Sequence, residues 1–196
     1  MHPRTHLSWT QLNLWEKSPK QYREVYIEGK KIPISRAIAL GKEIADALEK
    51  DEDIGEFEKD VVISRLLKYE MRDRSVEMKL KVGKEEVPIL IKPDSMKADY
   101  SAFREYKTGS EIWTQAKVDK WDQLTFYATG IFIITKKIPA IHLDWAETKI
   151  NEEGKPELTG EIYSFPTIRR MSHILSMMAR MRKVWKEIGE MCENEI

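Results

Sequence analysis

An aspartate and an E-x-K triplet lie near the middle of the chain, where two apolar stretches end. Pro93 and Asp94 close the first stretch, and Glu105, Tyr106 and Lys107 close the second. Because alternate residues of a strand face the same side, Glu105 and Lys107 are expected on one face, with Asp94 brought beside them by a short turn. Two carboxylates and an ammonium so placed favour a bound cation between them.

Carboxylate oxygens are the ligands that Mg²⁺ and Mn²⁺ prefer, and a neighbouring lysine can orient a water or stabilise charge at phosphorus. The set therefore predicts metal-assisted hydrolysis of a phosphodiester. A surface salt bridge between Lys107 and either carboxylate is the alternative in a chain with 34% charged residues. Such bridges contribute only ~0–1 kcal/mol to stability.

The composition limits the class of protein. The 196 residues carry 33 basic and 33 acidic side chains, and this zero net charge argues against a protein that coats nucleic acid through excess positive charge. Cys192 is the single cysteine, so an internal disulfide, a zinc–cysteine site and an iron–sulfur cluster are not expected. No apolar run is long enough to span a membrane and no signal-peptide pattern opens the chain, which predicts a cytoplasmic protein without a membrane partner.

Hydrophobic periodicity predicts one domain over residues 1–196. It has N-terminal helices in 8–70, a catalytic core in 75–165 and a basic C-terminal helix in 166–193. The third helix, over 36–50, is expected to place Ile38, Ala45 and Leu48 on one face. A helix capped at Ser8 is expected to be broken or restarted at Pro19 and to be followed by a second short helix toward Tyr26. The other expected helices cover 61–69 and 118–134, and the expected strands cover 75–82, 87–96, 103–108, 138–149 and 157–165. This order predicts an α/β fold with a mixed sheet of about five strands flanked by helices.

The middle of the chain resembles the core of the PD-(D/E)xK nuclease superfamily, in its RecB-like and Cas4-like branch. The resemblance is carried by Asp94, then Glu105-Tyr106-Lys107-Thr108-Gly109, then a helix with Gln123 and Tyr127 in a Q-x-x-x-Y pattern. Residues 8–12 and 18–22 are similar to two elements near the start of that branch, and residues 41–49 are similar to its G-x-x-x-H helix. The matching elements span residues 8–128 in the order of that branch.

This resemblance implies a restriction-endonuclease-like core and a role for each matching residue. Asp94 and Glu105 would bind Mg²⁺ or Mn²⁺, with the backbone carbonyl of Tyr106 completing the ligand set. Lys107 would position the attacking water or stabilise the charge that develops on the phosphate. Gln123 and Tyr127 would face the active site from one side of their helix. Without the resemblance, Tyr127 reads equally well as a core aromatic and Gln123 as a surface amide.

Two departures from the family pattern affect the expected ligands. Ala45 stands where the family often has a histidine, so a carboxylate from the same helix, Glu43 or Asp46, is expected to replace it, and Glu43 is favoured. Neither side chain points in the direction of position 45, because neighbouring helical residues are rotated by about 100°. Ser18 stands where iron–sulfur members have a cysteine, which again predicts no cluster.

The last helix carries the candidate DNA-binding residues. Lys and Arg neutralise phosphates without regard to sequence, so this helix is predicted to form one wall of a DNA groove. An ordinary solvated face is the alternative. Trp113 and Trp121 could stack on unpaired bases, although core packing is favoured for Trp121. The candidate DNA-binding residues are Arg169, Arg170, Arg180, Arg182 and Lys183.

Together these features predict a metal-dependent DNA nuclease, with an exonuclease favoured over an endonuclease, in recombination, repair or phage replication. No phosphate-binding G-x-x-x-x-G-K-[ST] loop is present, so a helicase or recombination partner would supply any translocation. One alternative is a catalytically idle DNA- or protein-binding module on the same scaffold. A second is an unrelated α/β enzyme whose carboxylates are surface charge. The sequence does not define an oligomeric state.

Overall fold

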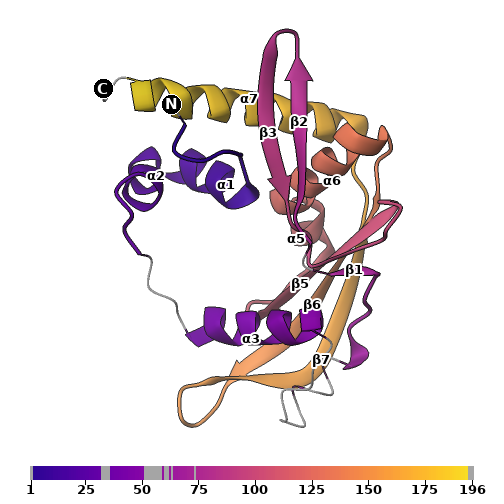
Figure 1. Cartoon of the computed structure of the whole chain (residues 1–196). Helices are drawn as coiled ribbons and strands as arrows, with labels where there is room; N and C mark the ends of the chain where they lie inside the picture. The colour runs from indigo at the N-terminus through magenta and orange to yellow at the C-terminus, as the bar shows by residue number, and fades with distance from the viewer. Residues whose placement is uncertain are drawn as a thin grey trace.

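The structure, a computed structural model, describes residues 2–31, 36–50, 59, 62, 64–72 and 74–193 (Figure 1). The helices are α1 (Trp9–Lys17), α2 (Pro19–Tyr26), α3 (Arg36–Lys50), α5 (Gln115–Asp119), α6 (Asp122–Thr135) and α7 (Met171–Glu193). The strands are β1 (Met71–Arg72), β2 (Val76–Val82), β3 (Glu85–Ile91), β4 (Ser95–Met96), β5 (Ala102–Gly109), β6 (Ala140–Ile150) and β7 (Pro156–Thr167).

Within the described residues, five strands form one sheet in the order β1-β4-β5-β6-β7. β5 and β6 run parallel, whereas β4 pairs antiparallel with β5 and β7 pairs antiparallel with β6. The predicted α/β fold with a mixed five-stranded sheet flanked by helices is therefore confirmed. No helix in the described part of the chain is both long and apolar enough to cross a membrane.

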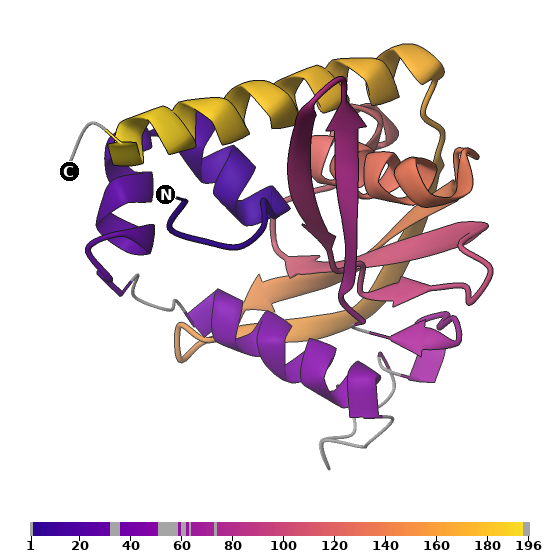
Figure 2. The ribbon, with the colours of Figure 1, turned by 45° about the horizontal axis from the view of Figure 1, so that its top comes forward.

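The two faces of the sheet are covered by different helices (Figures 1 and 2). α3 covers one face, where Leu40, Ile44 and Ala47 pack with residues of β6 and β7. On the other face α6 packs against the sheet, and α7 and α1 pack on α6. The β2–β3 hairpin crosses α6 at Gly130, where an added Cβ would lie only 2.5 Å from Ile91 Cγ2.

Several predicted helix boundaries are confirmed because local chemistry determines them. Ser8 and Ser18 cap α1 and α2, each accepting a hydrogen bond from the backbone N–H three residues later. Pro19 occupies the first turn of α2, where its missing N–H costs nothing. The third helix covers 36–50 as predicted. Most of the helix predicted over 61–69 falls outside the described residues, although Val62, Ser64 and Arg65 are helical.

Three details of the prediction are wrong. The strand expected over 87–96 is divided between β3 and β4, which belong to different sheets, because Pro93 has no N–H for a ladder. The helix expected over 118–134 is two helices, since Trp121 between them is extended. Pro166 does not open the last helix but continues β7, an edge strand where a proline is tolerated. On α3, Ile38 and Ala45 line one pocket, in agreement with their predicted common face, although both are exposed.

Candidate active site

The candidate active site lies where β4 separates from β5. Ser95 pairs with Arg104, and the chain just before it, at Asp94, leaves the ladder. One oxygen of the Asp94 carboxylate, Oδ2, then accepts a hydrogen bond of 2.6 Å from the backbone N–H of Tyr106. Asp94 therefore occupies the place beside β5 that a longer β4 would have filled.

The same geometry directs the carbonyl of Tyr106. In an extended strand the N–H and C=O of one residue point to the same side, so this carbonyl points to the open edge at which Asp94 lies. The Tyr106 phenol is anchored elsewhere, because it donates a 2.7 Å hydrogen bond to the carbonyl of Leu67. Burial raises the pKa of Tyr106 to about 12, so the phenol stays neutral at physiological pH.

Glu105 is the most buried acid of the site, with a side chain only 3% exposed. Its Oε1 atom accepts hydrogen bonds from Lys107 Nζ at 2.6 Å and from Gln123 Nε2 at 2.7 Å. Its Oε2 atom is buried and has no hydrogen-bond partner among the described residues. A carboxylate oxygen buried in this way is costly to desolvate, so its lack of a partner requires an explanation.

Lys107 lies on the same strand face as Glu105, as predicted, and its side chain is 25% exposed. Burial alone would lower the pKa of Lys107, but the nearby carboxylates of Glu105 and Asp94 outweigh it and the pKa is raised. The ammonium is thus within electrostatic reach of both acids.

Gln123 and Tyr127 approach the site from α6. Besides its bond to Glu105, the Gln123 amide donates to the Tyr127 hydroxyl at 3.0 Å, and its oxygen accepts from the Trp121 ring N–H at 3.3 Å. The structure therefore brings Gln123 to Glu105 and places Tyr127 beside Gln123 on the same side of α6. Trp121 was predicted to be a core or stacking residue. The contact of Trp121 with the Gln123 amide was not predicted, and the signal for it in the sequence is that the two residues are only two positions apart.

A pocket of ≈ 400 Å³ opens between α3 and the edge of β5. Asp94, Tyr106, Lys107 and Thr108 form its polar wall, and Ile38, Gly41, Ile44 and Ala45 form its apolar wall. Gly41 is closely approached, since an added Cβ would lie 2.9 Å from Thr108 Oγ1. Ala45, at the position that matches the family histidine, lines the same pocket as Asp94.

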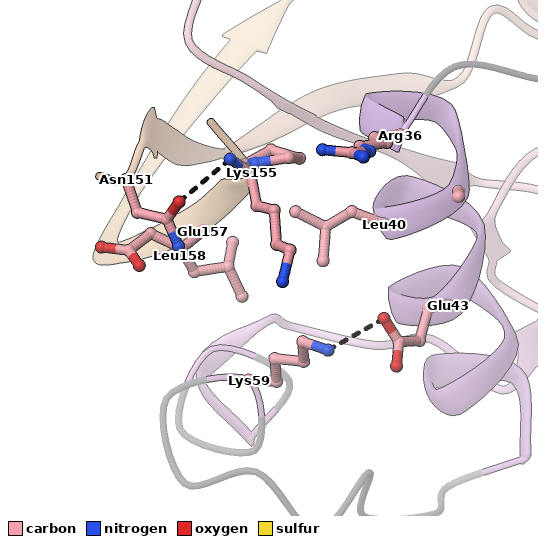
Figure 3. Close-up of a pocket in the computed structure, with 10 residues that line it drawn as sticks. Arg36, Leu40, Glu43, Lys59, Asn151, Lys155, Glu157 and Leu158 are labelled. Carbon is pink, nitrogen blue, oxygen red and sulfur yellow. Dashed lines mark hydrogen bonds and ion pairs between the residues drawn. The ribbon is translucent and has the colours of Figure 1, made fainter. Parts of the chain in front are cut away.

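The structure does not bring Glu43 to this pocket. Glu43 lines a different pocket of ≈ 820 Å³ on another flank of α3, and Lys59 Nζ lies 2.9 Å from its Oε2 atom (Figure 3). The expectation that Glu43 replaces the missing histidine as a metal ligand is therefore corrected. The reason is the helical rotation, which turns position 43 away from the side that carries Gly41 and Ala45.

The remaining oxygen atoms fit a hard divalent cation. Glu105 Oε2, the Asp94 carboxylate and the Tyr106 carbonyl are the oxygen donors that β5 and the turn before β4 offer, and Oε2 is the one that is buried without a hydrogen-bond partner among the described residues. The described residues contain no cluster of three or more His, Cys, Asp or Glu side chains suited to a metal. Any cation here would thus have two carboxylate ligands and fill its shell with backbone and water oxygens.

The candidate DNA-binding residues do not form one free basic wall. Arg169 is 5% exposed and uses its guanidinium inside the protein, donating to Thr125, Thr167 and the carbonyls of Val118 and Trp121. Its prediction as a DNA contact is corrected, because its donors are already used in the core.

The other candidate basic residues lie on or next to α7. Arg180 pairs with Glu16 and Asp122, and Arg182 pairs with Glu85. Arg170 and Lys183 are exposed. These two residues keep the side-chain exposure that a phosphate contact needs.

The Trp113 side chain is also buried, so its ring is not accessible to stack on a base. Its ring meets Trp121 edge to face with centroids 4.9 Å apart, and Lys117 Nζ lies 4.2 Å from the ring centroid. The loop after β5 is therefore closed by aromatic packing against the start of α6.

No protein-family model matches the chain, and no curated protein sequence matches it. Among solved structures, "Putative exonuclease" from Eubacterium rectale superposes with a TM-score of 0.61 at 12% sequence identity, over 97% of this chain and 82% of that chain. This chain therefore shares its fold with that protein. The structure of SSO0001 aligns with a TM-score of 0.47 at 12% identity, over 92% of this chain and 76% of that chain.

Proposed function

We propose that the chain is a Mg²⁺- or Mn²⁺-dependent deoxyribonuclease. The observation that carries the proposal is the Glu105 Oε2 atom, which is buried without a partner among the described residues, on the strand that Asp94 flanks. A nuclease-like fold and a structural neighbour named as an exonuclease support the same activity. The resemblance of residues 8–128 to RecB-like and Cas4-like nucleases supports DNA as the substrate.

Each residue of the site has a role in this proposal. Asp94, Glu105 and the Tyr106 carbonyl would hold the cation, which when bound polarises the phosphodiester and lowers the pKa of a coordinated water. Lys107 presents a positive charge next to Glu105 Oε1, where it would stabilise the charge that develops on phosphate oxygens. Gln123 holds the Glu105 carboxylate in place by donating to its Oε1 atom, and Tyr127 accepts a second hydrogen bond from the same amide.

The finer assignments rest on the family resemblance. We favour an exonuclease that acts on free DNA ends in recombination, repair or phage replication, with a helicase or recombination partner supplying any movement along DNA. Exposed basic residues such as Arg170 and Lys183 would contribute non-specific phosphate contacts.

The test is cleavage of end-labelled linear single-stranded and double-stranded DNA, and of circular duplex, with Mg²⁺, Mn²⁺ or EDTA. We expect wild type to shorten linear DNA from its ends only when metal is present, and Lys107→Ala to reduce the rate at least about 100-fold. Lys84→Ala, an exposed lysine in the β2–β3 turn, is the matched control and should cut like wild type.

Cutting of circular duplex would replace the exonuclease assignment with an endonuclease. If wild type and Lys107→Ala leave all three substrates equally intact with both metals, the nuclease proposal is wrong. DNA binding without cleavage would then identify an idle binding module.

A further inference from the structure

The side-chain amide of Gln123 has a hydrogen-bond donor beside its oxygen and hydrogen-bond acceptors beside its nitrogen. Its oxygen accepts a hydrogen bond from the Trp121 ring N–H at 3.3 Å. Its nitrogen donates to Glu105 Oε1 at 2.7 Å and to the Tyr127 hydroxyl at 3.0 Å.

Only one orientation of this amide satisfies both neighbours. An indole N–H can only donate and an ionised carboxylate can only accept. If the amide were rotated by 180°, its NH₂ would face the indole N–H and its oxygen would face the Glu105 carboxylate. Both contacts would then be repulsive, so Trp121 and Glu105 together select the observed orientation.

Trp121 is itself held firmly enough to impose this selection. Its ring packs edge to face against the ring of Trp113, and the angle between the two ring planes is 74°. Its backbone carbonyl accepts a hydrogen bond of 3.0 Å from buried Arg169. The position of the ring N–H is thus set by contacts on both sides of the loop that leads into α6.

The consequence falls on Glu105. Gln123 and Lys107 both donate to Oε1, and this leaves Oε2 as the oxygen without a partner among the described residues. We infer that Trp121 is a positioning residue of the site, because its ring N–H fixes the Gln123 amide so that Glu105 presents Oε2 to the cation. The cation in this statement rests on the proposed function, whereas the amide orientation does not.

The first test measures the orientation without metal or substrate. In ¹⁵N-labelled protein, the Gln123 side-chain amide is assigned by the resonance pair that disappears in Gln123→Ala. We expect its protons to exchange slowly with solvent in wild type and at least about tenfold faster in Trp121→Phe, which keeps an aromatic ring but removes the donor. Trp15→Phe is the matched control, because it removes a 2.9 Å indole bond to Glu187 between α1 and α7, remote from Glu105.

The second test measures the consequence by calorimetric titration with Mn²⁺. We expect Trp121→Phe to weaken binding about two- to tenfold, which is the range for one lost hydrogen bond. In a Gln123→Ala background the same change should cost nothing further, because the residue that transmits it is absent. Trp15→Phe should bind Mn²⁺ like wild type, and thermal unfolding of each variant shows that it is folded.

Two results would overturn the inference. One is unchanged amide exchange in Trp121→Phe. The other is a Trp121→Phe loss of Mn²⁺ affinity that is equally large in the Gln123→Ala background, since that loss would come from packing and not from the amide. If wild-type protein binds no Mn²⁺, the proposed function fails instead, and the amide exchange alone decides whether Trp121 orients Gln123.

Discussion

At Gly41 helix α3 closely approaches Thr108 of β5, and we predict that Gly41→Ala destabilises the protein there. The added Cβ would lie 2.9 Å from Thr108 Oγ1, closer than a carbon and an oxygen can remain without a shift of the helix or the side chain. Overpacking of this kind costs about 1–3 kcal/mol. Alanine recovers about 1 kcal/mol of helix propensity. The free energy of unfolding should therefore fall by zero to about 2 kcal/mol.

A second substitution separates these two contributions. Thr108→Ala removes Oγ1, which among the described residues is the only atom within 4 Å of the added Cβ apart from nearby backbone and chain neighbours. In that background, Gly41→Ala should lose the crowding cost and keep the propensity gain, so the free energy of unfolding should rise by up to about 1 kcal/mol. Gly41→Ala is thus expected to lower the free energy of unfolding of the wild-type protein, or leave it unchanged, and to raise that of the Thr108→Ala variant.

The assay is urea unfolding followed by circular dichroism, with thermal unfolding as a second readout. In a chain of this size, 1 kcal/mol corresponds to about 2–4 °C in melting temperature. The close packing of α3 on β5 would be refuted if Gly41→Ala changed the free energy of unfolding equally in the wild-type and Thr108→Ala backgrounds.

Three further predictions follow from the same contacts. Arg169→Met should lower the free energy of unfolding by about 2–4 kcal/mol in urea titrations, because it leaves buried hydroxyl and carbonyl groups unpaired, while DNA affinity of the folded protein stays unchanged. Lys183→Ala should lower the salt slope of DNA binding, measured by fluorescence anisotropy, by about 1 and change stability by less than about 0.5 kcal/mol. Burial, with the nearby Arg104 charge, lowers the pKa of His142 below 6.5 despite Asp144, so its neutral form is favoured by folding. Stability should consequently fall as pH drops from about 7 through the lowered pKa, and His142→Gln should flatten this part of the urea-unfolding pH profile; an equally steep profile in the variant would contradict it.

The sequence predicts those parts of the fold that local chemistry determines. The serines before α1 and α2 cap those helices, and alternation defines β2. The approach of Asp94 to Tyr106 also follows from the sequence, since a short turn joins two strands that end near each other. Q-x-x-x-Y spacing places Gln123 and Tyr127 on one side of α6.

The remaining features depend on tertiary packing, which the sequence does not display. α3 has small or apolar residues on several sides, so its periodicity does not say whether Ile38 or Leu40 faces the sheet. Arginine is a residue type typical of DNA contacts, yet Arg169 is buried where α5, α6 and β7 meet. Glu43 is one residue from Ile44 in sequence and still faces another pocket.

The central claim is that Glu105 and Asp94 share a divalent cation, and the most direct measurement is an anomalous difference map from a crystal soaked in Mn²⁺. We predict a peak within direct bonding distance of Glu105 Oε2 and the Asp94 carboxylate, on the side of β5 to which the Tyr106 carbonyl points. A peak bound to Glu43 instead, or a fully soaked crystal with no peak between Asp94 and Glu105, would contradict the claim.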